Sequence, residues 1–448
     1  MTLSERDRKI IWHPYSQEKT ADLPIAVRKA SGSYLYDDQG NEYLDLISSW
    51  WVNLHGHANP EIAKAIYDQA LSLEHVIFAG FTHAPAVTLC EKLRHILPQN
   101  LTRFFFSDNG STAVEIALKT AYQYHYNRGF KERTLFMSFE GGYHGDTFGA
   151  MSVGNKSGFH DIFQSLFFDV ITVPYPETWD GDERCVSKEQ EALAFIEHKF
   201  VHQGTKIASI IIEPLIQGAS GMRVCRPEFI TEVVKLAKKY DILTIFDEVM
   251  TGFCRTGTYF AADRIKVEPD FICLSKGITG GFLPLALTVT TNEIYEAFLS
   301  DDVAYAFMHG HSYTANPLAC VAAIKSLELL TSRKTQEAVA SISEIHRMNL
   351  HKLKESHADK IRNIRILGTI AAFEVTPSEV KEFESLAEEN INKYLKKAFL
   401  NKNLLIRPIK NVIYLMPPYC ITGDELEQAY RKIDEVLNET LGREKVTR

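Results

Sequence analysis

The sequence predicts an α/β protein, with a mainly parallel sheet between helices and a smaller α+β domain. Between about residues 100 and 310, short apolar runs rich in β-branched and aromatic residues alternate with helical patterns, as in parallel strands joined by helices. Beyond residue 316, helical patterns dominate. The length of 448 residues also exceeds what one hydrophobic core usually supports. We therefore expect more than one domain.

The elements follow in order along the chain. Residues 33–46 read as two short strands around a turn at residues 38–40. Residues 59–61 are Asn-Pro-Glu, which are residue types that open a helix, and apolar residues continue on one face as far as Leu73. The large sheet is predicted to contain strands at 103–107, 134–139, 208–214, 242–247 and 271–276, with helices at 112–127 and 227–240.

The C-terminal part has its own helical patterns. These predict helices at 317–331, about 336–355, 382–402 and 423–440, with an apolar segment at 407–418 before the last one. We predict that residues 59–315 form the large ligand-binding domain and residues 316–448 the small domain. Residues 1–58 are predicted to be an N-terminal segment that joins the small domain.

Composition and charge exclude several classes of protein. A content of 45% hydrophobic and 24% charged residues excludes intrinsic disorder, and the net charge of −8 argues against binding to nucleic acid or an anionic membrane. The seven cysteines include no CxxC pair, which argues against a zinc ribbon and a secreted disulfide framework. The N-terminus lacks a signal peptide's apolar stretch, and no apolar run approaches the roughly 20 residues of a membrane span. We expect a cytoplasmic protein.

Two predicted strands end in groups that could carry chemistry. One ends in Asp247 and Glu248, and another ends in Lys276. Ligands of open parallel sheets bind beyond the carboxyl ends of strands. A lysine in that place is usually solvent-exposed, but Lys276 follows an apolar strand and precedes the glycine-rich residues 277–281. A lysine that is desolvated there has a lowered pKa and can form a Schiff base with a carbonyl group.

Two further segments could complete such a site. Thr112 and Glu115 have the spacing of a capping box that opens a helix, and the free N–H groups at a helix start suit a phosphate monoester. The same pattern also fits a capped helix with no ligand. Tyr143 lies on a glycine-flanked loop after the strand at 134–139. It could offer a stacking face, or the loop could be a simple turn.

The triplets His55-Gly56-His57 and His309-Gly310-His311 raise the question of a metal site. No cysteine or carboxylate lies beside them at ligand spacing, and a glycine between histidines also marks a tight turn close to a ligand. We therefore expect no metal. The sequence also lacks a G-x-S-x-G elbow, a Walker A loop and a G-x-G-x-x-G motif, which argues against the common hydrolases, NTPases and dinucleotide-binding enzymes.

A Schiff-base lysine, an acid, a helix start and a stacking ring are together what pyridoxal 5′-phosphate requires of its protein. The segment DEVMTGFCRTG (247–257), followed by Lys276 in SKGITGG, resembles the class III aminotransferases of fold type I. Within that class, the resemblance is to members that aminate 8-amino-7-oxononanoate in biotin synthesis. The stretches that carry it are 11–17, 48–57, 78–86, 141–154 and 406–419.

This resemblance implies roles for particular residues. Lys276 would form the Schiff base with pyridoxal 5′-phosphate, Asp247 would pair with the pyridine nitrogen and Tyr143 would stack on the ring. Gly110 and Ser111 would hold the phosphate. The loop with His311 and Ser312 would reach that phosphate from the other subunit of a homodimer, so that the two subunits share their active sites. The residues implied to line the substrate pocket are Tyr15, Trp50, Tyr143, Lys276, Gly310, Arg407 and Tyr414, with Asp146 nearby.

Among these pocket residues, Tyr15 is also assigned to catalysis and Arg407 to a substrate carboxylate. The sequence departs from the class at three places. Met250 replaces a common glutamine, Cys254 replaces a common glycine, and residues 311–312 replace a Pro-Thr pair of some relatives.

The residues Ser48-Ser49-Trp50-Trp51 resemble those of class members that use S-adenosylmethionine, which implies this compound as the amino donor, although the loop HGHSY (309–313) also occurs in relatives that use lysine. A tryptophan face can pack an adenine and attract a sulfonium cation. The alternatives are lysine as the donor, or another class III ω-aminotransferase that acts on a diamine or β-amino acid. A cofactor-sensing regulator would need a basic DNA-binding domain, and the sequence shows no spare segment for one. A binding protein without catalysis would not need Lys276 and Asp247 together.

Overall fold

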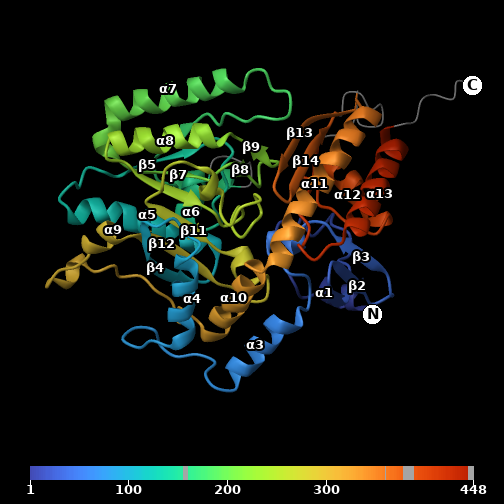
Figure 1. The fold of residues 1–448 in the computed structure, drawn as a ribbon, viewed down its shortest axis with the longest axis horizontal. Coiled ribbons are helices and arrows are strands. Elements are labelled where there is room, and N and C mark those ends of the chain that lie inside the picture. Colours follow the sequence, from blue (N-terminus) through green and yellow to red (C-terminus); the bar gives the residue numbers. More distant parts are fainter. Residues whose placement is uncertain (155–159, 359, 377–387, 442–448) are drawn as a thin grey trace, which may run out of the picture.

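A seven-stranded sheet forms the centre of the larger part of the molecule (Figure 1). In this computed structural model the described residues are 1–154, 160–358, 360–376 and 388–441. The strand order is β4-β12-β11-β10-β7-β5-β6. Neighbours from β11 to β6 pair in parallel, whereas β12 is antiparallel to both of its neighbours. The predicted α/β fold with a mainly parallel sheet is therefore confirmed.

The structure confirms each of the five predicted sheet strands and adds two. The added strands are β6 and β12, which the sequence patterns do not predict. The seven strands are β4 (Leu101–Ser107), β5 (Leu135–Phe139), β6 (Val170–Val173), β7 (Ile207–Ile212), β10 (Leu243–Asp247), β11 (Phe271–Leu274) and β12 (Ala286–Thr291).

Helices cover both faces of this sheet because its strands are apolar on both sides. Side chains alternate between the faces along a strand. Ile245 of β10 joins the apolar cluster that contains α5 (Gly110–Asn127), whereas its neighbour Phe246 joins the cluster that contains α8 (Pro227–Lys239). This layering leaves the carboxyl ends of the strands at one edge of the sheet.

The other elements of the larger part are short or peripheral, apart from α7 and α10. Helix α10 packs against α3 and α4. The helices are α3 (Pro60–Ala70), α4 (Ala84–Arg94), α6 (Phe148–Val153), α7 (Cys185–Gln203), α9 (Asn292–Glu296) and α10 (Pro317–Leu330). The remaining elements are β8 (Ile216–Gln217), β9 (Arg223–Val224), η1 (Asp161–Leu166), η2 (Gly204–Lys206), η3 (Ala261–Arg264), η4 (Lys276–Thr279) and η5 (Val303–Tyr305).

The smaller part contains a three-stranded antiparallel sheet, with strand order β13-β14-β16. Its strands are β13 (Ile361–Leu367), β14 (Ile370–Val375) and β16 (Val412–Leu415), and its helices are α11 (Arg333–Ser356), α12 (Glu388–Asn401) and α13 (Gly423–Leu441). The helices agree with the prediction, although residues 382–387 of the predicted helix 382–402 lie outside the described residues. The prediction omits β13 and β14.

The N-terminal strands lie beside these C-terminal elements, blue next to red in Figure 1. The predicted hairpin is confirmed as an antiparallel pair, β2 and β3, and β3 pairs in parallel with β15. The elements here are α1 (Leu3–Asp7), β1 (Val27–Ser31), β2 (Tyr34–Asp37), β3 (Glu42–Asp45), α2 (Ser48–Trp51) and β15 (Leu404–Leu405). The predicted domain boundaries stay a prediction.

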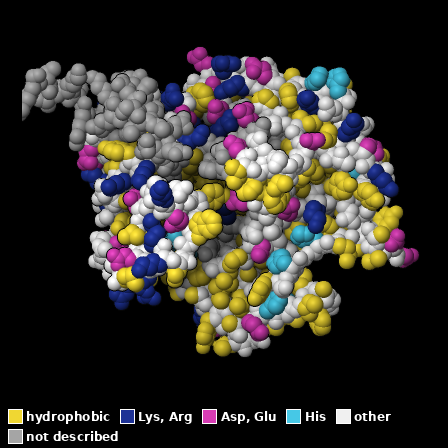
Figure 2. All heavy atoms as spheres, turned by 180° about the vertical axis from the view of Figure 1, so that it is seen from behind, with side chains coloured by type: hydrophobic (Ala, Val, Ile, Leu, Met, Phe, Trp, Pro, Cys, Tyr) yellow, Lys and Arg dark blue, Asp and Glu magenta, His cyan; other side chains and the backbone are white. Residues whose placement is uncertain are grey.

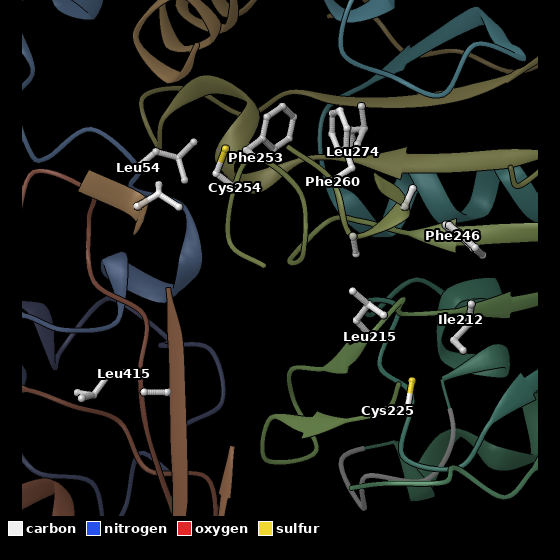
Figure 3. Packing of buried hydrophobic residues seen from close by; sticks show 14 of the residues in the cluster. Leu54, Ile212, Leu215, Cys225, Phe246, Phe253, Cys254, Phe260, Leu274 and Leu415 are labelled. Carbon is white, nitrogen blue, oxygen red and sulfur yellow. The ribbon is translucent and has the colours of Figure 1, made fainter. Parts of the chain in front are cut away.

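One apolar cluster joins the two parts of the molecule. Figure 3 shows some of its members, including Phe246 and Leu274 from the large sheet, and Leu54 and Leu415 from the N-terminal and C-terminal segments. Both parts can therefore contribute residues to one site.

None of the helices in the described residues combines the length and apolar character that a membrane crossing needs.

Candidate active site

Asp247 and Lys276 lie close together because they follow neighbouring parallel strands. Asp247 is the last residue of β10 and pairs in register with Cys273 of β11, three residues before Lys276. The two strands run in the same direction, so their carboxyl ends meet at one edge of the sheet. The structure thus brings together the acid and the amine that the sequence singles out.

The Lys276 side chain lies in a partly closed environment. Its backbone has a φ of 45°, and its Nζ lies 4.7 Å from the centroid of the Trp51 ring. Burial lowers the pKa of the Lys276 amine, while the negative charges of Asp247 and Glu213 oppose part of this shift. A lowered pKa leaves more of the amine uncharged, and the uncharged form is the nucleophile and base.

His144 is the side chain that holds Asp247, a role that is not predicted from the sequence. Asp247 is buried, its Oδ2 lies 2.7 Å from Nδ1 of His144, and its Oδ1 accepts a hydrogen bond of 3.1 Å from the N–H of Val249. Burial would lower the pKa of His144, but the hydrogen bond and the charge of Asp247 raise it overall. The sequence signal that could have indicated this role is the position of His144 directly after Tyr143, on the same glycine-flanked loop.

Glu213 is a second buried acid at this site, and no sequence motif predicts its role. It follows β7, and its carboxylate accepts hydrogen bonds of 3.0 Å from the N–H groups of Tyr143 and Gly218. Burial raises the pKa of Glu213 to about 7. Glu213 therefore fastens the loop of Tyr143 to the end of a third strand, next to β10 in the sheet.

The predicted helix start near Ser111 is present, but the predicted capping box is wrong. Helix α5 begins at Gly110, because the side chain of Asn109 accepts a 3.0 Å hydrogen bond from the N–H of Thr112 and forms the box with it. Glu115 instead accepts hydrogen bonds at the start of α6, including one of 2.6 Å from the N–H of Gly149.

The start of α5 lies directly against the strand end that carries Asp247. A Cβ atom on Gly110 would lie only 2.6 Å from Cγ1 of Val249, so this close approach requires glycine. The hydroxyl oxygens of Ser111 and Thr147 lie 2.7 Å apart. The first N–H groups of a helix and two hydroxyl groups are suitable donors to a phosphate.

A second group of side chains extends outward from Tyr143. The hydroxyl oxygens of Tyr143 and Tyr15 lie 3.1 Å apart, and the Tyr15 hydroxyl donates to Asp146. The rings of Tyr15 and Trp50 meet edge to face at 5.5 Å, and the guanidinium of Arg407 lies 4.5 Å from the centroid of the Trp50 ring. The structure therefore places these predicted pocket residues in one continuous row.

The pKa of Tyr15 is raised to about 12, first by burial and then by the hydrogen bond to Asp146. Its hydroxyl therefore stays protonated at neutral pH. Tyr414 lies deeper than this row, since it is 1% exposed and its hydroxyl accepts a 3.1 Å hydrogen bond from Nε1 of Trp51. Tyr414 contacts the ring that packs on Lys276.

Two of the three departures from the class pattern, Met250 and Cys254, lie in different parts of the molecule. Met250 is buried in the same apolar cluster as Trp51 and Tyr414, so it lies behind the site. Cys254 is fully buried in the main apolar core and accepts a 3.4 Å hydrogen bond from Nε2 of Gln336. Of these two residues, only Met250 belongs to the apolar cluster of Trp51 and Tyr414.

The loop of Gly310, His311 and Ser312 is not part of this group. Its neighbour His309 lies 3.0 Å from Nζ of Lys119 on α5, and Tyr313 packs on His75. Within the described part of the chain, no hydrogen bond joins these loop residues to Lys276, Asp247 or Tyr143.

The other histidine triplet has ordinary partners. Nε2 of His57 lies 2.9 Å from Asp45, and Nε2 of His55 lies 3.1 Å from the Ser326 hydroxyl. Among the residues described, no group of three or more histidine, cysteine, aspartate or glutamate side chains could hold a metal ion.

The residues present fit pyridoxal 5′-phosphate. A desolvated amine, a buried carboxylate and an aromatic ring surround the strand ends, and the helix start of Gly110 lies against them. These are the chemical groups that would hold an aldehyde, a pyridine ring nitrogen and a phosphate.

Comparisons with known proteins agree with this geometry. The model of the family "Aminotransferase class-III" matches residues 15–437. The adenosylmethionine-8-amino-7-oxononanoate aminotransferase of Synechococcus elongatus is 48% identical over 96% of this chain and 98% of its own length. A crystal structure of the protein of that name from Methanocaldococcus jannaschii has a TM-score of 0.89 and 37% identity, over 98% of this chain and 99% of its own.

A third relative is the ω-transaminase of Pseudomonas jessenii, solved in complex with PMP. It has a TM-score of 0.90 and 25% identity, over 99% of this chain and 100% of its own. The chain therefore belongs to the class III aminotransferases, enzymes that depend on pyridoxal 5′-phosphate, which confirms the family and the cofactor predicted from the sequence.

Proposed function

We propose that this aminotransferase converts 8-amino-7-oxononanoate to 7,8-diaminononanoate in biotin synthesis, with S-adenosylmethionine as the amino donor. The relative with 48% identity carries the name of this reaction. The observation that carries the proposal is the row of Tyr15, Trp50 and Arg407 beside Tyr143. It offers an apolar face that ends in a cation, which suits an aliphatic chain that ends in a carboxylate.

At the inner end, Lys276 and Asp247 would carry the chemistry. Bound pyridoxal phosphate supplies an electron sink for the negative charge left when the donor's α-carbon loses a proton. Lys276 would anchor the cofactor and move that proton, which its lowered pKa favours. Asp247, held by His144, would keep a positive charge on the pyridine nitrogen through electrostatic attraction. Gly110 and Ser111 would hold the phosphate.

At the outer end, substrate would bind along the row. Arg407 would form charge-assisted hydrogen bonds with a substrate carboxylate. Trp50 would cover the apolar chain, and the Tyr15 hydroxyl, which donates its proton to Asp146, would accept a hydrogen bond from a donor group near the reacting carbon. Tyr143 would stack on the cofactor ring, and Tyr414 would support Trp51.

We also propose a homodimer with shared active sites. The support is the position of His311 and Ser312, which within the described part of the chain form no hydrogen bond with Lys276, Asp247 or Tyr15, together with exposed apolar side chains around their loop. Met308 and Tyr313 are among these, and residues of α5 and of the segment 304–308 line a groove of about 520 Å³. In Figure 2, further apolar side chains gather at the lower part of the molecule, where α3 and α4 lie in Figure 1. A second copy would cover these surfaces.

The reaction can be tested with each donor separately. Purified protein loaded with cofactor is mixed with S-adenosylmethionine or lysine alone, and the change in cofactor absorbance is followed before 8-amino-7-oxononanoate is added. We expect conversion by S-adenosylmethionine and formation of 7,8-diaminononanoate. Conversion by lysine alone would overturn the donor. Failure to aminate 8-amino-7-oxononanoate, with turnover of other ketones, would overturn the substrate.

Subunit mixing tests the shared site. A Lys276→Ala chain and a His311→Ala/Ser312→Ala chain are each expected to be nearly inactive. In a hybrid dimer one site carries both changes and the other carries neither, so part of the activity should return. No return of activity, with subunit exchange demonstrated, would place the loop in its own subunit's site.

We further propose that the protein is cytoplasmic. The free state of all seven cysteines supports this location.

A further inference from the structure

Four consecutive residues near the site have a left-handed backbone, although none of them is glycine. Their φ angles are 50° for Ser48, 45° for Ser49, 71° for Trp50 and 75° for Trp51. L-amino acids with a Cβ atom avoid this region, and it normally occurs at single residues. Such a run persists only where surrounding contacts impose it, and strain of this kind is concentrated at functional sites.

The turn sends two adjacent indole rings to two different parts of the site. The ring of Trp50 lies between Tyr15 and Arg407, in the outer row. The ring of Trp51 packs on the Lys276 amine, and its Nε1 donates to Tyr414. The left-handed turn therefore links the groups that would bind substrate to the groups that would carry the chemistry.

Asp45 is the centre of the contacts that hold this turn. It is fully buried at the end of β3. Its Oδ1 accepts a 3.1 Å hydrogen bond from the N–H of Ile47, and its Oδ2 accepts one of 2.8 Å from the Ser49 hydroxyl. Nε2 of His57 lies 2.9 Å from the same Oδ2. The carboxylate thus contacts the turn, the residue before it and the segment after it.

His57 is itself oriented, and the turn has a second attachment. Nδ1 of His57 lies 3.1 Å from Nδ2 of Asn53, so the amide donates and Nε2–H is directed to Asp45. The Ser48 hydroxyl donates a 2.7 Å hydrogen bond to the carbonyl of Met416. The turn is therefore held against the N-terminal hairpin on one side and the C-terminal segment on the other.

We propose that Asp45 and His57 are positioning residues, which hold the left-handed turn and thereby aim Trp50 at the substrate and Trp51 at Lys276. The inference rests on the proposed function for the identity of the substrate, and it deepens that function by naming what shapes the pocket. Neither residue is among those proposed to bind substrate or cofactor. Their effect passes through the backbone of residues 48–51.

The test uses Asp45→Asn in the full-length, cofactor-loaded protein. The asparagine amide would place a donor against the donors of Ser49 and His57, so the turn should relax. Trp12 and Trp179 are replaced by phenylalanine, which leaves Trp50 and Trp51 as the chain's tryptophans. We expect a changed near-ultraviolet circular dichroism of these two indoles without substrate, and a KM for 8-amino-7-oxononanoate raised at least tenfold, with a lower kcat.

Asp37→Asn is the matched control. Asp37 is also buried and accepts backbone hydrogen bonds, of 2.9 Å from Gln39 and 2.8 Å from Asn41, but it does not contact the turn. This variant should keep the wild-type dichroism and KM even if its Tm falls.

Two His57 variants keep the proposal testable if Asp45→Asn does not fold. His57→Gln retains a donor for Asp45 and should resemble the wild type, whereas His57→Leu should reproduce the Asp45→Asn effects. Wild-type dichroism and KM in His57→Leu would overturn the proposal. The dichroism needs no substrate, so a wrong substrate assignment would leave this readout unaffected.

Discussion

The inner and outer ends of the candidate site are built in different ways. Lys276 and Asp247 occupy the ends of adjacent parallel strands, where the register of the sheet alone brings them together. Trp50 and Arg407 come from segments near opposite ends of the chain, on irregular backbone. The geometry of the inner end is therefore determined by the sheet. The geometry of the outer end is determined by how the two parts of the molecule pack against each other.

The energetic difference follows from the same comparison. A left-handed residue with a Cβ atom costs about 1–2 kcal/mol, and the outer end includes four of them in succession. The inner end is supported instead by a buried hydrogen bond between Asp247 and His144. Changes at the inner end should lower kcat, and changes at the outer end should mainly raise KM.

The largest expected effect is that of Lys276→Ala. Turnover should be abolished, because the amine that anchors the cofactor and moves the proton is lost, while the fold should survive. Borohydride reduction of the wild type should attach the cofactor covalently to Lys276, as identified by peptide mass spectrometry. Lys396, whose pKa is also lowered by burial, serves as the comparison and should remain unlabelled. A label on any other lysine would end the assignment.

Asp247→Asn should be the second largest effect and should sharpen the inner half of the comparison. Removing a preorganised charge next to a developing charge costs on the order of 3 kcal/mol, so kcat should fall by at least about 10²-fold with cofactor still bound. Asp270→Asn is the matched control, since Asp270 is a half-buried acid that accepts a 2.7 Å hydrogen bond from the N–H of Thr244 at the start of β10. Equal values of kcat in Asp247→Asn and wild type would show that a residue other than Asp247 pairs with the pyridine nitrogen.

Arg407→Lys tests the outer half. A lysine keeps the charge but loses the planar fork and the stacking on Trp50. We expect KM for 8-amino-7-oxononanoate to rise about tenfold, which corresponds to about 1.4 kcal/mol, with kcat nearly unchanged. Steady-state kinetics measure KM and kcat separately. A fall in kcat at constant KM would contradict the division between the two ends.

The last prediction concerns the stability of the small part of the molecule and its response to pH, and no change in activity is expected from it. His346 of α11 is buried, and burial lowers its pKa to about 4. In the unfolded chain a histidine takes up its proton near pH 6.5. The stability that the neutral ring contributes is therefore complete above pH 6.5 and is lost as the pH falls towards 4, by at most about 1.4 kcal/mol per pH unit.

Thermal unfolding between pH 4 and 7 checks this expectation. His346→Gln should show a smaller loss of Tm on acidification than the wild type. His351→Gln, which changes an exposed histidine on the same helix, should follow the wild-type curve. Parallel curves for His346→Gln and wild type would show that another group controls the acid response.

The regular part of the fold could be predicted, and so could the inner pair of residues. Apolar runs separated by helical patterns predicted the parallel strands, and parallel strands bring their ends together. The capping box shows where local patterns mislead, because Thr112 and Glu115 have a suitable spacing while Asn109 caps the helix. His144 was missed because its partner, Asp247, lies on a different strand.

By itself, the sequence determined the α/β class, the strand ends that carry Asp247 and Lys276, and the family to which they belong. The class and the strand ends depend on side-chain periodicity and on residue order, which are local properties, whereas the family is recognised by the resemblance of motifs such as DEVMTGFCRTG (247–257). Only the tertiary structure decided that Asp45 and His57 hold a left-handed turn and that Arg407 covers Trp50. A strained backbone leaves no local pattern in non-glycine residues, because the contacts that stabilise it come from segments that meet only in the folded chain.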